Sequence, residues 1–206
     1  EMSKKTTDSL ALEASFLDQP NTPMLLTEHA RLVDQVLSGV WAELSAPPGI
    51  ALVAVGGYGR GQLFPHSDVD VLILLPQDAD VAAAAALERL LTSLWDIGVE
   101  VSHAVRKPAN CTVEMASDAT VRTSLLEHRR LAGSRRLYAE FKAAFDASLD
   151  VRAFYDAKSL EQQQRHLKYH DAAYNLEPNV KESPGGLRDL QTVVWIARAA
   201  RLGRTW

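Results

Sequence analysis

The sequence has little of what would tie it to a membrane, an oxidising compartment or a nucleic acid. Cys111 is the only cysteine among 206 residues, so no internal disulfide can form, as is typical of a protein kept reduced. No apolar run approaches the length of a membrane span, and no long apolar segment follows the first lysines as in a signal peptide. The net charge is −4, whereas broad binding of nucleic acid favours a basic surface. We therefore expect a cytoplasmic protein without a membrane or nucleic-acid partner.

The sequence does have a globular composition and, in its first half, a pattern of helices and strands. Hydrophobic residues make up 47% of the chain, which is enough for a core. After a loose polar arm of about twenty residues, apolar periodicity predicts a helix over residues 27–44, capped by Thr27. Short apolar runs bounded by glycine or proline predict strands at residues 50–55 and 69–75. An alanine-rich helix that ends at Trp95 and a third strand at residues 99–105 follow.

The second half of the sequence is expected to be helical from residue 112 to the end. Ser117 and Ser134 are expected as helix caps, with a long polar helix over residues 150–174 and another over residues 187–201. We divide the chain into an amino-terminal arm and helix, a core, and the start of a helical domain, at residues 1–48, 49–148 and 149–206.

A glycine pair and two carboxylates lie between the first two expected strands. Gly56 and Gly57 end the first apolar run, and glycines let backbone amides approach phosphate closely. Strand side chains alternate faces, so Asp68 and Asp70 point the same way, and such a close pair repels unless a cation lies between them. Their hard oxygen ligands suit Mg²⁺. Two solvated acids in a turn are the alternative, less favoured because apolar strands flank the glycines and acids. The pattern predicts a site for a metal-bound nucleoside triphosphate.

Glu100 is the best candidate for a third metal ligand. It lies between Val99 and Val101 in the third expected strand, where alternation turns it away from the valines. Three carboxylates could hold two ions, roughly 3.5–4 Å apart, which clamp the attacking and leaving oxygens of an in-line displacement. The alternative for an isolated acid in a strand is a surface residue. We predict that Asp68, Asp70 and Glu100 are catalytic metal ligands for two Mg²⁺ ions, which Mn²⁺ can replace.

Further polar residues are candidates for binding the phosphates. Arg60 can neutralise a phosphate and the Ser67 hydroxyl can bond one, although a glycine-rich turn and a turn-capping serine are the alternatives. Lys181 and Arg188 flank a Pro-Gly-Gly turn that can bring two cations toward phosphate. The alternative is a helix-capping turn with Asp189 near a helix N-terminus, where acids are favoured. With the glycine pair, these four cationic or hydroxyl residues are the predicted nucleotide-binding set.

The pattern apolar-Gly-Gly followed by Asp-apolar-Asp resembles the signature of the DNA polymerase beta-like nucleotidyltransferase superfamily. The longer string over residues 56–70 is similar to the family of bacterial PII uridylyltransferase/uridylyl-removing enzymes, as are residues 99–106 and 177–191. The three matches follow the family's order and cover most of residues 50–200. The resemblance implies an α/β (α+β) fold with a small mixed-sheet core, flanking helices and a following helical segment.

The resemblance also implies an activity: Mg²⁺-dependent transfer of UMP from UTP to a tyrosine hydroxyl of the PII nitrogen-signalling protein, with release of pyrophosphate. In that family Asp68 and Asp70 would be metal ligands, Glu100 would take the place of the third carboxylate and help to activate the tyrosine, and Gly56 and Gly57 would face the triphosphate. The chain would be the amino-terminal transferase part of a longer enzyme. Its HD hydrolase and ACT domains would be missing, so uridylyl removal and glutamine control are expected to be absent.

Two other functions stay open. An adenylyltransferase that acts on glutamine synthetase has a related core, although the strand at residues 100–106 favours uridylyl transfer. A nucleotide-binding regulatory module without turnover is the second alternative.

Several residues that suggest other chemistry are given ordinary roles. His166 and His170 share a helix face, but a metal hydrolase needs further ligands, so we expect a polar face or a position near the nucleotide. Cys111 lacks an activating partner and is expected to be inert. Four arginines are expected to be solvated helix ends: Arg129, Arg130, Arg135 and Arg136.

Overall fold

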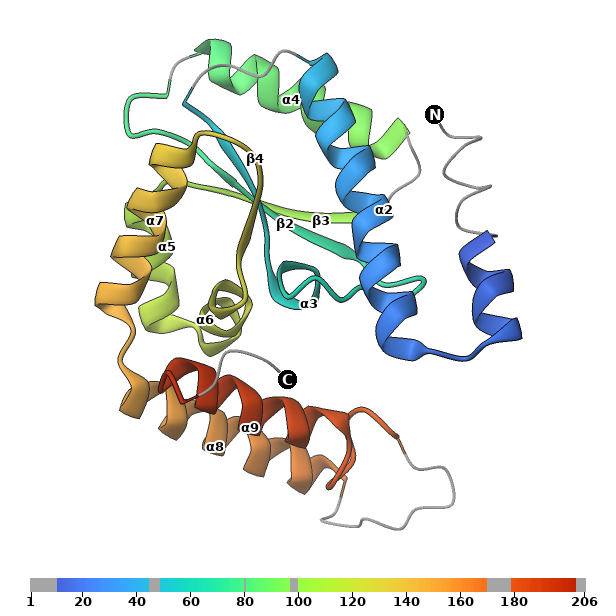
Figure 1. Cartoon of the computed structure of the whole chain (residues 1–206). Helices are drawn as coiled ribbons and strands as arrows, with labels where there is room; N and C mark the ends of the chain where they lie inside the picture. Colours follow the sequence, from blue (N-terminus) through green and yellow to red (C-terminus); the bar gives the residue numbers. More distant parts are fainter. Residues whose placement is uncertain (1–10, 45–48, 80, 97–99, 170–178, 203–206) are drawn as a thin grey trace.

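The computed structural model describes residues 11–44, 49–79, 81–96, 100–169 and 179–202. Within them lies a four-stranded sheet in the order β3-β2-β1-β4. Its strands are β1 (Ala51–Ala54), β2 (Val69–Leu74), β3 (Val101–Arg106) and β4 (Arg129–Gly133). β1 runs antiparallel to β2 and β4, and β2 runs parallel to β3. The expected α/β fold with a small mixed sheet is therefore confirmed (Figure 1).

Helices cover both faces of the sheet because its central strands are apolar on both sides. β1 is buried along its whole length, with Leu52 and Ala54 in one core and Ala51 and Val53 in the other. Strands covered on both faces typically form such continuous apolar runs. The helices over the first core are α2 (Thr22–Glu43) and α4 (Val81–Asp96), and those over the second are α5 (Pro108–Ser117), α6 (Ala119–Leu126) and α7 (Arg135–Ser148).

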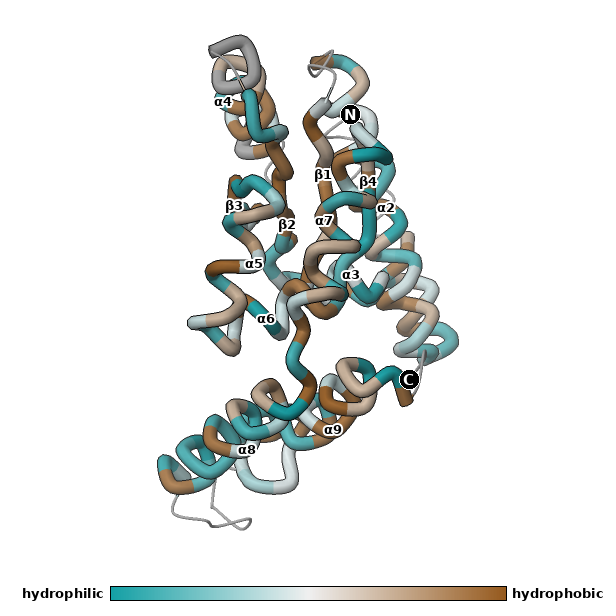
Figure 2. The backbone as a smooth tube through the Cα atoms, turned by 90° about the vertical axis from the view of Figure 1, so that its left-hand side faces the viewer, coloured by the Kyte–Doolittle hydropathy of each residue, from teal (hydrophilic) through white to brown (hydrophobic). Residues whose placement is uncertain are grey.

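Two further helices, α8 (Val151–Lys168) and α9 (Leu187–Ala199), lie side by side below the sheet (Figures 1 and 2). Phe154 and Trp195 are buried between them, and Leu126 of α6 packs against this small apolar cluster. The cluster attaches the helix pair to the core. The domain limits at residues 1–48, 49–148 and 149–206 stay a prediction. None of the described helices is both long and apolar enough to cross a bilayer.

The amino-terminal segment is more helical than expected. Residues 11–18 form a helix rather than a loose arm. α2 begins at Thr22 rather than Thr27 because the Asn21 side chain accepts a hydrogen bond from the Met24 amide. The Thr27 hydroxyl instead donates to the Pro23 carbonyl one turn earlier. Asn21 as the capping residue and Pro23 in the first turn therefore mark the start of α2.

The second half of the chain contains a strand where only helices were expected. β4 pairs with β1, so Arg129 and Arg130 lie in a strand and not at solvated helix ends. The Arg129 guanidinium donates to both Asp34 carboxylate oxygens, at 2.6 and 3.0 Å. Every residue of β4 is at least partly exposed. Because the strand begins with two arginines, its sequence shows no alternation of apolar and polar residues. The error therefore comes from an edge strand with no periodic signal of its own.

The helix caps are confirmed in part. Ser134 caps α7 by accepting a hydrogen bond from the Leu137 amide. Ser117 does not cap α6, because the next residue, Asp118, accepts from the Thr120 and Val121 amides. α8 starts after its cap Asp150, as expected, but its last helical residue is Lys168. His170 lies outside the described residues.

Candidate active site

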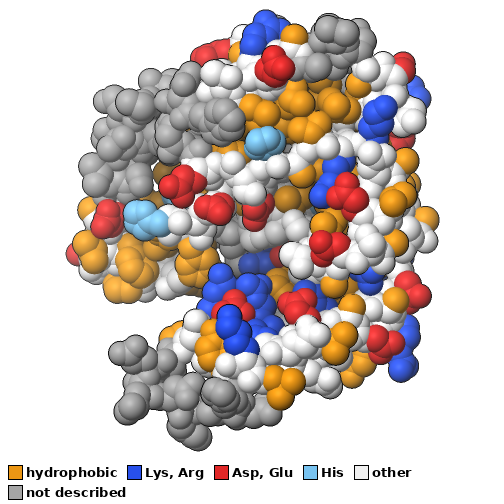
Figure 3. Space-filling view, turned by 180° about the vertical axis from the view of Figure 1, so that it is seen from behind, with side chains coloured by type: hydrophobic (Ala, Val, Ile, Leu, Met, Phe, Trp, Pro, Cys, Tyr) orange, Lys and Arg blue, Asp and Glu red, His pale blue; other side chains and the backbone are white. Residues whose placement is uncertain are grey.

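A cleft of about 620 Å³ separates the sheet from the α8–α9 pair. Its upper wall comes from the segment between β1 and β2, and its lower wall comes from the two helices and the turn before α9. Figure 3 shows basic side chains gathered where the molecule is hollowed and acidic side chains across from them. Eight of the nine predicted site residues line this cleft: Gly56, Gly57, Arg60, Ser67, Asp68, Asp70, Lys181 and Arg188. Segments that are distant in the sequence therefore converge on one site.

The glycine-rich segment forms the short helix α3 (Gly56–Gly59) directly after β1. Gly56 has φ +59°, a left-handed conformation that favours glycine, and a Cβ there would lie 3.3 Å from Asp70 Oδ2. A Cβ at Gly59 would lie only 1.9 Å from the Glu127 carbonyl oxygen. The two glycines therefore allow α3 to pack closely against β2 on one side and against the end of α6 on the other.

The two aspartates lie at the start of β2, as predicted. Asp68 is exposed just before the strand, and Asp70 is half-buried within it. Burial raises the pKa of Asp70, the charge of Asp68 raises it further, and a hydrogen bond with the Ser102 side chain opposes the rise. A divalent cation would relieve the cost of holding both carboxylates ionised, and the glycine at position 56 leaves space beside Asp70. The pair therefore fits a hard cation.

Glu100 is not brought into this cluster. It is exposed and lies just before β3, where its carbonyl accepts a hydrogen bond from the Val69 amide at 2.8 Å. It lines a second cavity, of about 610 Å³, between residues 11–18, α2 and the loop before β2. Among the described residues, no three His, Cys, Asp or Glu side chains are grouped to hold a metal ion. The role of Glu100 as third ligand stays a prediction.

Arg60 is held by a buried glutamate that the sequence did not point to. Its Nε donates to Gln62 Oε1 at 3.0 Å, and its guanidinium forms an ion pair with Glu127. The Glu127 side chain is 1% exposed and also accepts from Arg198 Nη1 of α9 at 2.9 Å. Ser67 is exposed and lines both cavities. No motif surrounds Glu127, so its role could only be seen once α3, α6 and α9 were brought together.

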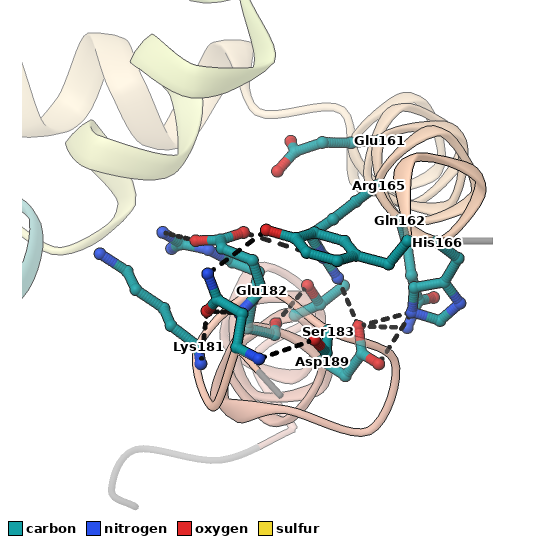
Figure 4. A network of polar contacts seen from close by, with 12 residues as sticks. Glu161, Gln162, Arg165, His166, Lys181, Glu182, Ser183 and Asp189 are labelled. Carbon is teal, nitrogen blue, oxygen red and sulfur yellow. Dashed lines mark hydrogen bonds and ion pairs between the residues drawn. The ribbon is translucent and has the colours of Figure 1, made fainter. Parts of the chain in front are cut away.

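The turn before α9 presents Lys181 and Arg188 to the cleft. Lys181 is exposed, and in Figure 4 its side chain extends away from the polar network and toward the core. Arg188 donates to Gln191 Oε1 at 3.1 Å and Glu182 Oε1 at 3.3 Å, and its guanidinium lies 5.4 Å from the Trp195 ring centroid. Both cations therefore line the cleft that also holds the glycine pair and the two aspartates.

Asp189 lies in the first turn of α9 and anchors the turn before that helix, as the alternative interpretation expected, while phosphate binding by Lys181 and Arg188 stays a prediction. Its carboxylate accepts from the Gly185 amide at 2.7 Å, from Gln162 at 3.0 Å and from Arg165 (Figure 4). His166 Nε2 lies 2.9 Å from the same carboxylate. Burial alone would raise the pKa of Asp189, but these hydrogen bonds hold it at about 2. The network fixes the turn against α8, and His166 belongs to it.

A second group of cleft residues was also missed: Lys158 and Glu161 of α8 and Trp195 of α9. The Lys158 side chain is 3% exposed, its Nζ lies 2.7 Å from Glu161 Oε2, and it lies 4.9 Å from the Trp195 ring centroid. Lys158 follows the buried Phe154 by four residues, which places it on the inner face of α8. The four-residue spacing from Phe154 could have indicated that Lys158 is buried, but a single lysine in a polar helix is normally read as a surface residue.

Comparison with known proteins supports a nucleotidyltransferase core. A family model described as a nucleotidyltransferase domain matches residues 37–132, and one described as GlnD PII-uridylyltransferase matches residues 153–206. A Bordetella avium protein is 54% identical over 94% of this chain and 22% of its own length. A Burkholderia orbicola protein is 52% identical (93% and 22%), and one from Cupriavidus metallidurans is 50% identical (98% and 24%). All three are named bifunctional uridylyltransferase/uridylyl-removing enzyme.

A solved toxin–antitoxin structure with AMP-PNP is 13% identical over 68% of this chain and 98% of its own, with a TM-score of 0.34. The matches to the curated relatives extend over nearly all of this chain, although the chain spans only 22–24% of the length of those three relatives. The chain belongs to the family of bifunctional uridylyltransferase/uridylyl-removing enzymes and contains a nucleotidyltransferase domain.

Proposed function

We propose that this chain transfers UMP from UTP to a tyrosine hydroxyl of the PII signalling protein and releases pyrophosphate. The observation that carries the proposal is the convergence of the paired aspartates, the glycine segment and two cations on one cleft. The names of the relatives support uridylyl transfer over adenylyl transfer to glutamine synthetase. Uridylyl removal is named for those longer proteins, and we propose only the transfer reaction for this chain.

The cleft residues have distinct tasks in this reaction. Lys181 and Arg188 neutralise the triphosphate, and the glycine segment lets backbone approach it closely. Arg60, held by Glu127, and Ser67 contribute a further cation and a hydroxyl on the opposite wall. Binding from both walls fixes the α-phosphorus in place, which is the main contribution a protein makes to phosphoryl and nucleotidyl transfer.

Asp68 and Asp70 would hold Mg²⁺, or Mn²⁺ in its place. The ion, when bound, neutralises charge on the phosphates and polarises the α-phosphate for attack. The tyrosine oxygen forms a bond to the α-phosphorus while the bond from that phosphorus to the bridging oxygen breaks, so that pyrophosphate leaves. Glu100 is our candidate to receive the tyrosine proton, because its exposed side chain lies at the same end of the sheet as the aspartates.

The test follows α-labelled UTP and α-labelled ATP with PII as acceptor, with and without Mg²⁺. We expect label on PII from UTP, release of pyrophosphate, and a loss of both of at least about 100-fold in Asp68→Asn/Asp70→Asn. Transfer from ATP alone would show an adenylyltransferase. UTP binding that survives the double substitution, with no pyrophosphate from the unmutated chain, would show a binding module without turnover. Full activity in the double variant would contradict the assignment of Asp68 and Asp70 to the active site.

A further inference from the structure

The cleft wall formed by α8 contains a charged pair that phosphate binding does not require. Lys158 and Glu161 lie one turn apart, with Nζ and Oε2 2.7 Å from each other. The lysine side chain is 3% exposed and the glutamate side chain 39%, yet both line the cleft. In Figure 4, Glu161 projects from α8 on its own, apart from the network around Asp189. The pair therefore lines the cleft and is not part of the network that fixes the turn.

A buried ammonium group needs more partners than this one has. An ammonium carries three N–H donors, and a charge removed from water is costly unless those donors are used. The hydrogen bonds of the described residues give Lys158 Nζ one acceptor, Glu161, and the Trp195 ring face lies on another side. The Trp195 Nε1 is itself buried without a hydrogen-bond partner among the described residues. The Lys158 ammonium therefore has donor capacity left for an acceptor on a ligand in the cleft.

The same helix offers a comparison that separates this pair from an ordinary surface pair. Arg152 and Asp156 are also one turn apart on α8, at 3.3 Å, but their side chains are 84% and 58% exposed. Such exposed pairs contribute little and need no further partner. Lys158 has the same type of neighbour but faces the cleft in an almost fully buried position. A solvated helix face explains Arg152 and Asp156 and does not explain Lys158.

We propose that Lys158 and Glu161 form the subsite that recognises the nucleotide base and that they select uracil. Uracil presents a carbonyl acceptor, O4, beside a ring donor, N3–H. A lysine donor beside a glutamate acceptor is the matching arrangement, with Lys158 donating to O4 and Glu161 accepting from N3–H. This inference rests on the proposed function, which places the triphosphate at Lys181, Arg188 and the glycine segment of the same cleft.

The same pair disfavours the other pyrimidine. Cytosine has an amino donor at position 4 and an unprotonated acceptor at N3, the reverse order. Its amino group would face the Lys158 ammonium, and its N3 would face the Glu161 carboxylate, so both contacts would be unfavourable. A site with fixed hydrogen-bonding groups rejects a ligand of the wrong pattern strongly, because the buried groups of the site are left unpaired.

The experiment measures equilibrium binding of UTP and CTP, each with Mg²⁺, to the 206-residue chain by calorimetry. We expect the unmutated chain to bind UTP at least about tenfold more tightly than CTP. In Glu161→Gln the ratio should fall to roughly two, because the glutamine amide can either accept from N3–H or donate to N3. Asp156→Asn, on the same helix but outside the cleft, should leave the ratio and both affinities unchanged. Lys158→Met should weaken UTP binding about tenfold, because one charge-assisted hydrogen bond to the base is lost, at an unchanged unfolding temperature.

Each result has a distinct consequence. An unmutated ratio near one, or a ratio that Glu161→Gln leaves unchanged, overturns the base subsite and leaves the transfer reaction standing. If neither nucleotide binds to the unmutated chain, the proposed function itself fails. Should Lys158→Met fail to fold, Glu161→Gln decides the question alone, because its side chain is substantially exposed and its replacement keeps the same shape.

Discussion

Arg198 of α9 donates to the Glu127 carboxylate at 2.9 Å, and this bond ties the carboxyl-terminal helix pair to the core. The other Glu127 oxygen is paired with Arg60 beside the glycine segment. One buried carboxylate thus connects the upper and lower walls of the cleft. The width of the cleft, and with it the approach of Lys181 and Arg188 to a ligand, depends on this connection.

Replacing Glu127 should therefore destabilise the whole chain. In Glu127→Gln the two arginines lose their shared countercharge in a buried position, and we expect a loss of about 2–4 kcal/mol in the free energy of unfolding. Urea denaturation followed by circular dichroism measures it. Glu140→Gln is the matched control, because Glu140 pairs with Arg136 on the surface with side chains 51% and 90% exposed; its loss should stay under about 0.5 kcal/mol. Equal losses in the two variants would contradict the connecting role of Glu127.

Gly59 should tolerate no side chain. A Cβ there would meet the Glu127 carbonyl oxygen at 1.9 Å and the Ala54 carbonyl oxygen at 2.9 Å, both backbone atoms that cannot move aside cheaply. Gly59→Ala is expected to lose about 2 kcal/mol or more, as other overpacked buried sites do. A Cβ at Gly57 would instead lie 3.5 Å from its nearest neighbour, an ordinary contact. Thermal unfolding of Gly59→Ala and Gly57→Ala should separate them clearly, and a Gly59→Ala chain as stable as the unmutated one would contradict the packing of α3.

The sequence was informative where chemistry follows from neighbouring residues. The glycine pair, the two aspartates and the Pro-Gly-Gly turn are local patterns, so Gly56, Asp68, Asp70 and Lys181 could be predicted as one nucleotide site, and the structure places them along one cleft. β4 could not, because it becomes a strand only by pairing with β1, far earlier in the sequence.

Glu127 and Lys158 were missed for a related reason. Each is a single charged residue without a motif, and its importance comes from burial that depends on three or more elements packing together. Periodicity reports which face of a helix is apolar, but it does not report a charge buried among cations or over an aromatic ring. The connection between the cleft walls through Glu127 and the base subsite at Lys158 could therefore be inferred only from the structure.

Lys181 should act on nucleotide affinity and not on stability. Its exposed side chain reaches into the cleft from the turn that Asp189 holds. In Lys181→Met we expect UTP binding to weaken about tenfold, with a smaller dependence on salt, because one charge-assisted contact to phosphate is lost. Lys168→Met, in the last turn of α8, is the control and should bind UTP normally. If both variants bind UTP as the unmutated chain does, Lys181 does not contact the phosphates.

Mild acid should destabilise the core through His128. Its ring is packed edge-on against Tyr138, Phe141 and Phe145. Burial lowers the pKa of His128 to about 4, with the charge of Lys142 acting in the same direction and that of Asp146 opposing it. The unfolded chain, with an ordinary histidine pKa near 6.5, takes up a proton first as the pH falls.

The free energy of unfolding should therefore decline between about pH 6.5 and pH 4, by roughly 3 kcal/mol from this group, and its contribution should level off below pH 4, where both states are protonated. Urea titrations at half-unit pH steps measure the decline. His128→Phe keeps an aromatic ring in the same packing and removes the titrating group, so its stability should change less over that range. Parallel pH profiles for the two chains would show that His128 is not held neutral by its surroundings.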